Sequence, residues 1–128
     1  MQTIRRNPTD GIYAASPDYV HALEIRGHGR TLYVSGTMGL DQDGKAGADL
    51  DEQLTLIWNN IRRILAEADM TTDNIVRLTS YLRDPSYAEA NQRARIAALG
   101  SHRVPTTALI AQTLREDWLV EIEVIAAA

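Results

Sequence analysis

The sequence predicts an α+β fold in which one mixed six-stranded sheet is covered on one face by two helices. Segments rich in β-branched and aromatic residues occur both before and after the helical part of the chain. Apolar residues recur at spacings of three and four between residues 50 and 65, and residues 84–100 carry the start and stop signals of a second helix. Because each helix must bury an apolar side, we expect both on the same face of a single sheet.

The N-terminal part of the chain is expected to contain a β-hairpin. Residues 1–18 are rich in Pro, Gly, Asn and Asp, which indicates an irregular arm with one short strand. The segments "YVHALEIR" and "TLYVSGTM" follow, and the "GHG" between them is a hairpin signal. If this turn joins them, Ala22 lies opposite Ser35, which places Tyr19 and His21 beside Ser35 and Gly36.

Two helices are predicted from their periodicity and their ends. The apolar stripe of the first consists of Leu50, Leu54, Ile57, Ile61, Ile64 and Leu65. Asp49 or Asp51 can cap its start. The second helix has Asp84 as its N-cap, Pro85 at its first position and Gly100 just past its end. Its apolar side is mostly alanine, so we expect it to pack closely.

The remaining strands are "NIVRLTSYLR", "TTALIAQT" and "WLVEIEVIA". Strand alternation puts Ile122 on one face of the last strand and Glu121 and Glu123 on the other, where they meet either water or a cleft. The side chains expected on the uncovered face of the sheet are Tyr33, Ser35, Thr79, Tyr81, Glu121 and Ile125. This mixture is typical of a surface that meets another subunit, and pockets at such junctions bind ligands.

Size and composition narrow the classes of function. The chain has 128 residues, so we expect one domain over residues 1–128. A net charge of −4 argues against a nucleic-acid partner, and no cysteine is available for disulfides or thiolate chemistry. The apolar runs are too short to span a membrane, and we expect a cytoplasmic protein. The scattered histidines and the absence of a phosphate-binding glycine motif predict no metal and no cofactor.

Several segments together resemble the RidA family, also called YjgF/YER057c/UK114. "LYVSGTMGLDQDG" resembles the family's strand and loop "(L/I)-Y-V-S-G-Q-(I/L)-x-x-D-x-x-G". The stretch "EQLTLIWNNIRRILAEADMTTDNIVRLTSYLRD" is similar to its helix–loop–strand centre, with Gln53 and Asn59 at matching positions. "YAEANQRAR", with Asn91, and the C-terminal "LVEIEVIA" follow in the family's order.

The resemblance implies a chorismate-mutase-like fold and a homotrimer with clefts between subunits. For many members it also implies cofactor-free hydrolysis of enamines and imines to ketones and ammonia. It assigns Glu121 to placing or activating water, which is work a carboxylate can do, and Tyr19 to the wall of the cleft. It further implies that Ser35, Gly36 and Asn91 contact or line the ligand site.

The chain departs from the family pattern at two positions. "VPTTAL" stands where the family has "P-A-R-(S/T)", so Thr107 replaces the arginine that grips a substrate carboxylate, and no residue from 104 to 114 is basic. His21 stands in place of a glutamine and adds an imidazole side chain. Threonine offers one neutral hydroxyl where arginine offers two charge-assisted hydrogen bonds. We therefore expect a substrate other than a standard 2-imino acid, unless Arg103 or Arg115 reaches the cleft.

Two hypotheses of function remain open at this point. The first is an enamine or imine hydrolase with Glu121 as acid and base, Tyr19 and His21 orienting substrate or water, and Thr107 and Ser35 holding the ligand. The second is a trimer that binds a small molecule without catalysis. Ribonuclease activity, attributed to some relatives, is disfavoured by the acidic charge and the lack of a basic groove. A role as a partner in a pathway complex also stays open.

Overall fold

The computed structural model describes residues 1–128, and two helices and six strands dominate it. The strands are β1 (Gln2–Arg5), β2 (Leu23–Arg26), β3 (Thr31–Met38), β4 (Ile75–Leu82), β5 (Thr106–Ile110) and β6 (Val120–Ala127). The helices are α1 (Leu50–Glu67) and α2 (Ala88–Leu99), and short 3-10 turns cover Thr72–Asn74 and Pro85–Tyr87. None of the helices combines the length and apolar character needed to cross a membrane.

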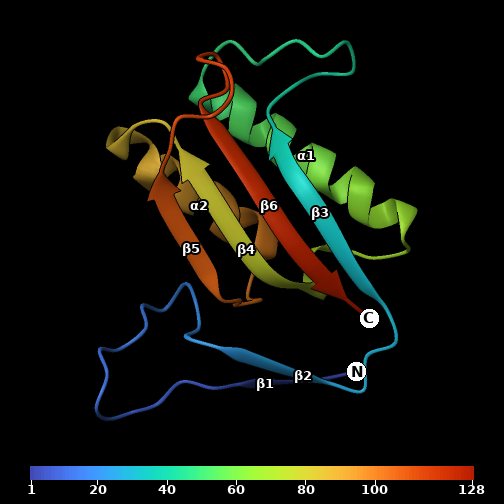
Figure 1. Cartoon of the computed structure of the whole chain (residues 1–128), viewed down its shortest axis with the longest axis vertical. Helices are drawn as coiled ribbons and strands as arrows, with labels where there is room; N and C mark the ends of the chain where they lie inside the picture. Colours follow the sequence, from blue (N-terminus) through green and yellow to red (C-terminus); the bar gives the residue numbers. More distant parts are fainter.

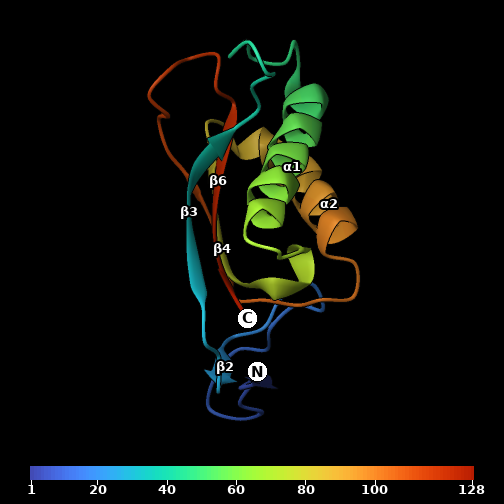
Figure 2. The same cartoon turned by 90° about the vertical axis from the view of Figure 1, so that its right-hand side faces the viewer.

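The centre of the fold is a four-stranded sheet with the strand order β3-β6-β4-β5 (Figure 1). β6 is antiparallel to both of its neighbours, whereas β4 and β5 run parallel because α2 crosses between them. Both helices lie on one face of this sheet, as the side view shows (Figure 2). The α+β class and the covering of a single face are therefore confirmed. The uncovered side is called the open face below.

The expectation of one six-stranded sheet is wrong in one respect, because β1 and β2 form a separate two-stranded ribbon. β2 pairs with β1 over four residues and does not pair with β3. The segment predicted to be a hairpin turn instead bonds to the other end of the chain. The backbone N–H groups of Gly29 and Arg30 donate to the carbonyl of Ala128, at 2.9 and 3.0 Å. This pairing keeps the start of β3 beside the C-terminus, and the ribbon projects from the body (Figure 1).

The core lies between the sheet and α1. The predicted apolar stripe is largely buried, with Ile57, Ile61 and Leu65 fully inaccessible to solvent, whereas Ile64 is partly exposed. Opposite the helices lie alternate β6 residues, including Val120 and Ile122, which are also fully buried. Burial of this stripe against the sheet is the main stabilising contribution to the packing of α1.

The helix starts follow the local signals in the sequence. Asp49, rather than Asp51, caps α1, because its carboxylate accepts a hydrogen bond of 2.8 Å from the Glu52 backbone N–H. Asp84 caps the 3-10 turn that precedes α2, and its carboxylate accepts from the Ser86 N–H at 2.9 Å. Gly100 ends α2 with a φ of 61°, a conformation that favours glycine.

The N-terminal segment is held to α2 by a largely buried ion pair. Arg95 is only 6% exposed, and its guanidinium donates to the Asp18 carboxylate at 2.7 Å and to the Asp18 carbonyl at 3.0 Å. Gln92 donates to the same carboxylate at 3.1 Å. Although burial alone would raise the pKa of Asp18, these hydrogen bonds outweigh it and hold the pKa below its usual value. Asp18 is therefore an ionised anchor for the segment that leads to β2.

Replacing Asp18 by Asn is expected to destabilise the fold. The substitution leaves the Arg95 guanidinium buried without a countercharge, so the free energy of unfolding should fall by about 2 kcal/mol. Glu89→Gln is the matched control, because Glu89 forms an exposed ion pair with Arg93 on the same helix and should change stability by less than about 0.5 kcal/mol. Urea denaturation measures both values. Equal losses in the two variants would contradict the anchoring role of Asp18.

Candidate functional site

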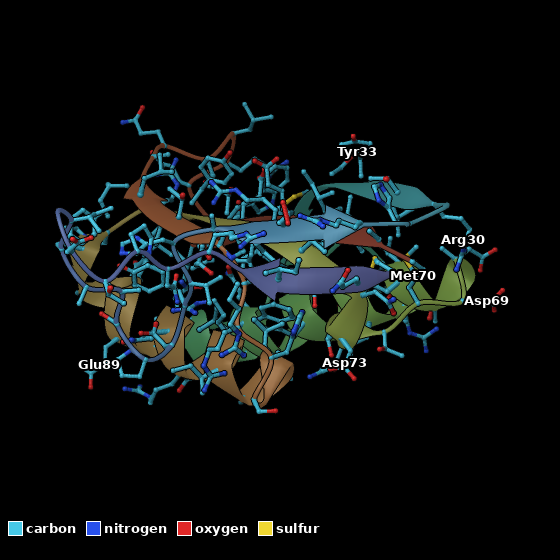
Figure 3. All side chains as sticks on the ribbon, turned by 90° about the horizontal axis from the view of Figure 1, so that it is seen from below. Arg30, Tyr33, Asp69, Met70, Asp73 and Glu89 are labelled. Carbon is cyan, nitrogen blue, oxygen red and sulfur yellow. The ribbon has the colours of Figure 1, made fainter.

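Strand β6 presents its two glutamates on the open face. Val120, Ile122 and Val124 are buried beneath the helices, whereas Glu121 and Glu123 alternate with them and remain partly exposed. The side chains therefore point away from the helical layer. Figure 3 shows the same division, with Tyr33 projecting from the side of the sheet opposite to Glu89 of α2. Glu121 and Glu123 are therefore part of the open face, which no other segment of the chain covers.

The strand register arranges the open face in rows. Glu121 lies between Tyr81 on β4 and Met38 on β3, and Leu109 on β5 completes this row. The next row contains Glu123, with Thr79 beside it on β4 and Thr107 beyond that on β5. A third row contains Ile125, flanked by Tyr33 and Arg77. Acidic, hydroxyl and basic side chains thus occur on one surface.

An irregularity in β3 makes room for Glu121. The pairing of β3 with β6 shifts register between Val34 and Thr37, so Ser35 and Gly36 form a bulge. A side chain at position 36 would overlap the Glu121 carboxylate, since an added Cβ would lie 2.8 Å from Glu121 Cδ. Glycine at this position therefore allows the carboxylate to lie against the strand.

The surroundings of Glu121 favour its protonated form. Burial raises the pKa of Glu121 above its usual value, and the negative charge of Glu123 raises it further. The Tyr81 hydroxyl donates a hydrogen bond of 2.6 Å to Glu123 Oε1. This bond, and with it desolvation and the charge of Glu123, raises the pKa of Tyr81, so Tyr81 stays a proton donor. Glu121 is therefore an acid that retains its proton more readily than an ordinary glutamate does.

Three cavities open around these residues. One of about 160 Å³ adjoins Glu121 and is lined by Tyr81, Ala111, Gln112, Thr113 and Leu114. A second, of about 390 Å³, is lined chiefly by Tyr33, Arg77, Thr79, Glu123 and Ile125. The third, of about 1,020 Å³, runs along the free edge of β3, where Ser35 and Gly36 contribute to its wall. Small-molecule sites in proteins usually have volumes of about 300–1,000 Å³. The second cavity lies within this range and the third at its upper limit, whereas the cavity beside Glu121 is smaller.

The residues predicted for ligand binding do not all meet within one chain. Ser35, Gly36 and Thr107 lie on the sheet strands with Glu121, but Tyr19 and His21 lie in the segment before β2. The predicted hairpin that would have placed them beside Ser35 is absent, because β2 pairs with β1. Their rings instead contact each other at a centroid distance of 6.0 Å.

Asn91 lies on the helical side of the sheet and is therefore separated from the open face. It is 3% exposed on α2, and its side-chain oxygen is buried without a hydrogen-bond partner. Buried polar atoms of this kind are uncommon in folded proteins. Within one chain, Asn91 therefore lies on the opposite side of the sheet from Ser35 and Thr107.

Neither Arg103 nor Arg115 bonds to Thr107. Arg103 donates to the backbone carbonyls of Pro17 and Gly100, and Arg115 pairs with Asp117. Sequence reasoning missed Arg77, whose guanidinium donates to the Thr107 hydroxyl at 2.7 Å. The alternation of β4 already placed Arg77 on the face of Thr79 and Tyr81, but only the pairing of β4 with β5 brings it to Thr107.

The chain contains no group of three or more His, Asp or Glu side chains arranged to hold a metal ion. The chemistry that the open face can perform with its own groups is proton transfer and hydrogen bonding. Glu121 can donate and accept a proton, while the hydroxyl groups of Ser35 and Thr107 can hold polar atoms of a ligand.

Comparison with known proteins gives a consistent result over most of the chain. Residues 10–128 match the family model described as Endoribonuclease L-PSP. The chain is 33% identical over 75 residues to the RutC family protein YjgH of Escherichia coli K12, a match covering 59% of this chain and 56% of that protein. It is 29% identical over 111 residues to a RutC family protein of Pyrococcus abyssi, covering 84% of each chain. The chain thus spans little more than half the length of the first relative.

Solved structures resemble the whole fold. The crystal structure of YyfB from Yersinia pestis, described as a protein of unknown function of the conserved Rid family, superposes with a TM-score of 0.85 at 27% identity and covers 100% of both chains. RidA from an Antarctic Psychrobacter superposes with a TM-score of 0.74 at 25% identity, covering 95% of this chain and 98% of that one. Both likenesses include the sheet that carries Glu121.

Adding a methyl group at position 36 is expected to displace the Glu121 carboxylate. In Gly36→Ala the Glu121 side chain must move toward solvent, so the pKa of Glu121 should fall toward its ordinary value. The free energy of unfolding should decrease by about 1 kcal/mol. A carboxyl-carbon NMR titration measures the pKa. Gly29→Ala is the control, because open space surrounds Gly29 and its φ is not left-handed. An unchanged Glu121 titration in Gly36→Ala would refute the close packing.

The raised pKa of Glu121 predicts how stability depends on pH. Because its pKa is higher in the folded state, Glu121 stabilises the fold fully below about pH 4, the ordinary range of glutamate, and this contribution is lost as pH rises through the raised pKa. Glu121→Gln, which carries no charge, should therefore be more stable than the unmodified protein at pH 7 and similar to it at pH 4. Urea denaturation at both pH values tests this, and a less stable variant at pH 7 would contradict it.

Proposed function

The chain belongs to the endoribonuclease L-PSP family, also known as the RidA or YjgF/UK114 family, and we propose that it hydrolyses the C–N bond of a small enamine or imine without a cofactor. Membership supports a small-molecule protein of the RidA type. The observation that carries the catalytic proposal is Glu121 itself, a partly buried carboxyl group with a raised pKa, lying beside an open cavity on the sheet.

Glu121 can supply the proton transfers that imine hydrolysis needs. In the first step its protonated form donates to the imine nitrogen while a water oxygen bonds to the imine carbon. The carboxylate next moves one proton from the added oxygen to the amine nitrogen, which gives a protonated carbinolamine. The carbon–nitrogen bond then breaks, ammonia leaves, and the carboxylate takes the remaining hydroxyl proton. One imine and one water thus give one ketone and one ammonia, and Glu121 returns to its starting form. An enamine enters the same sequence after protonation at carbon.

The other candidate residues are proposed to hold substrate or water. The Ser35 hydroxyl, the Gly36 backbone and the Thr107 hydroxyl lie on the sheet and can contact a ligand over the open face. Tyr19 and His21 are proposed to orient substrate or water. Within one chain these two residues precede β2 and lie outside the sheet that carries Glu121. We therefore propose that the Tyr19 and His21 of a neighbouring subunit complete the site.

Asn91 is also proposed to contribute to ligand binding, because its side chain has an unused hydrogen-bond acceptor. Its buried side-chain oxygen lacks a hydrogen-bond partner, which is a state that a ligand or a small movement can relieve. We propose that Asn91, which lies on the opposite face of the sheet from Glu121, supports the ligand site from within the helical layer.

A homotrimer with clefts between subunits is the assembly that we propose. The exposure of large apolar side chains supports it, since Tyr33 is 76% exposed, Leu109 40% and Leu114 91%. Leu114 also lines the cavity beside Glu121, so a covering subunit would bury that cavity. Burial of this kind would raise the pKa of Glu121 further and strengthen its role as an acid.

The substrate is proposed to differ from a standard 2-imino acid, because Thr107 replaces the family's carboxylate-binding arginine. The proposed substrate is either neutral or is held by a protein group other than an arginine at position 107.

RNA is not the proposed substrate despite the description of the family model, since two carboxylates occupy the open face and the net charge is −4. We propose a cytoplasmic location for this chemistry. The alternative function is binding of a small molecule without turnover, which the replacement by Thr107 favours.

Turnover of a panel of imines and enamines tests the function. Imines are generated in place by an amino-acid oxidase, with simple neutral enamines added separately, and ketone and ammonia are measured. Glu121→Gln should lower the rate by at least about 100-fold on any substrate found, because the general acid is lost. Glu116→Gln is the matched control, since Glu116 is an exposed residue of the loop before β6.

The outcomes separate the two functions. Ligand-induced thermal shifts with no product across the panel would support binding without catalysis. An unchanged rate in Glu121→Gln would refute the catalytic proposal. Thr107→Arg should gain activity on 2-imino acids, and full activity of the unmodified protein on those substrates would show that the substrate assignment is wrong.

A further inference from the structure

Arg77 lies on the open face without a carboxylate partner. No carboxylate oxygen lies within 4.0 Å of its guanidinium, and the Thr107 hydroxyl is its one side-chain hydrogen-bond partner. Two arginines with more of their donors engaged are Arg95, which is paired with Asp18, and Arg83, which donates twice to Thr113. A guanidinium carries several N–H donors in a planar fork, so most of the donors of Arg77 remain available.

Thr107 complements this arginine in a specific way. Its oxygen accepts the hydrogen bond from Arg77, and its own O–H is therefore still free to donate. A carboxylate accepts hydrogen bonds only, and it can take one from each of two neighbouring donors. The pair thus presents a positive charge and a neutral donor side by side.

A cavity lies in front of the guanidinium. It has a volume of about 390 Å³, and its lining includes Arg77, Thr79, Tyr33 and Ile125. Glu123 is the one acidic residue in this lining, and the Tyr81 hydroxyl already holds one of its oxygens at 2.6 Å. The cavity therefore combines an available cation, hydroxyl donors and apolar walls, a combination suited to a small organic anion.

We propose that the Arg77 guanidinium, which lines this cavity, binds the carboxylate of a small ligand there. Thr107 is outside the lining but contacts the guanidinium at 2.7 Å, and we propose that its hydroxyl donates a second hydrogen bond to the same carboxylate. The guanidinium on β4 would then supply the charge that residue 107 on β5 lacks. This proposal adds a carboxylate-binding site to the proposed hydrolase function, and it rests on that function only in treating the bound ligand as the substrate. Anion binding by Arg77 does not require that Glu121 catalyse any reaction.

The strand register also indicates what kind of carboxylate fits. Arg77 pairs with Ile125, whereas Tyr81 pairs with Glu121, and these positions on β6 are about 13 Å apart at the usual rise of a strand. The Arg77 side chain extends toward Thr107, which lies in the row next to that of Glu121, so the guanidinium is closer to Glu121 than the backbone of Arg77 is. The guanidinium and the Glu121 carboxylate nevertheless remain separate groups. A ligand that contacts both groups of one chain thus has its carboxylate several bonds from the reacting C–N bond. A 2-imino acid, with its carboxylate on the adjacent carbon, does not meet this requirement.

Binding of an isosteric pair of ligands tests the site. The probes are 4-oxopentanoate and its neutral amide, 4-oxopentanamide, titrated into the full-length protein and followed by calorimetry and by the NMR signal of the Arg77 Nε–H. The acid should bind at least about tenfold more tightly than the amide, because a charge-assisted hydrogen bond contributes that factor or more. The Arg77 signal should shift with the acid alone.

Variants assign the preference to particular residues. Arg77→Gln should remove the preference for the acid, Arg77→Lys should retain part of it, and Thr107→Val should weaken acid binding a few-fold. Arg26→Gln is the control, because Arg26 is exposed on the β1–β2 ribbon and pairs with Glu24. Thermal unfolding verifies that each variant folds. If Arg77→Gln does not fold, the Arg77→Lys and Thr107→Val variants decide the question.

Two results would overturn the proposal. One is equal affinity of the unmodified protein for acid and amide, including no binding of either. The other is an undiminished acid preference in folded Arg77→Gln or in both of the milder variants. Failure of the hydrolase function is recognised separately, since Glu121→Gln would then leave turnover unchanged or no substrate would be found, while acid binding through Arg77 persisted.

Discussion

The arrangement of the candidate site depends on the absence of a side chain at residue 36. The bulge of β3 brings the Gly36 backbone against the Glu121 carboxylate, and any Cβ there would occupy the same space. Because the carboxylate lies against the strand, it loses part of its hydration, and burial then raises its pKa. The neighbouring charge of Glu123 acts in the same direction. A steric feature of the backbone thus determines the chemical character of the acid.

The open face separates two tasks that a single site must combine. Glu121 and its small cavity lie in one row of the sheet, and Arg77 and Thr107 lie further along the strands. Glu123 stands between them, and the Tyr81 hydroxyl restrains one of its oxygens. This separation keeps the cation from pairing with Glu121, which would lower the pKa of that carboxyl group and weaken it as an acid. Proton transfer and charge recognition can therefore be adjusted independently in this sheet.

The sequence predicted local structure more accurately than the relation between distant segments. The stripe from Leu50 to Leu65 identified α1, and the alternation around Glu121 identified the two faces of β6, because each pattern follows from the geometry of a single element. The hairpin expected at "GHG" does not form. Gly29 and Arg30 bond to Ala128 instead, and β1 takes the edge of β2. A glycine turn permits either arrangement, and competition among distant partners decides between them.

By itself, the sequence determined the helices, the strands, the glutamates of the open face and the absence of basic residues from positions 104–114, since these are properties of residue type and local periodicity. Only the tertiary structure decided that β2 leaves the main sheet, that Gly36 accommodates Glu121, and that Arg77 bonds to Thr107 thirty positions away. These contacts depend on strand order and register. Both are set by the packing free energy of the whole chain, which no short stretch of residues contains.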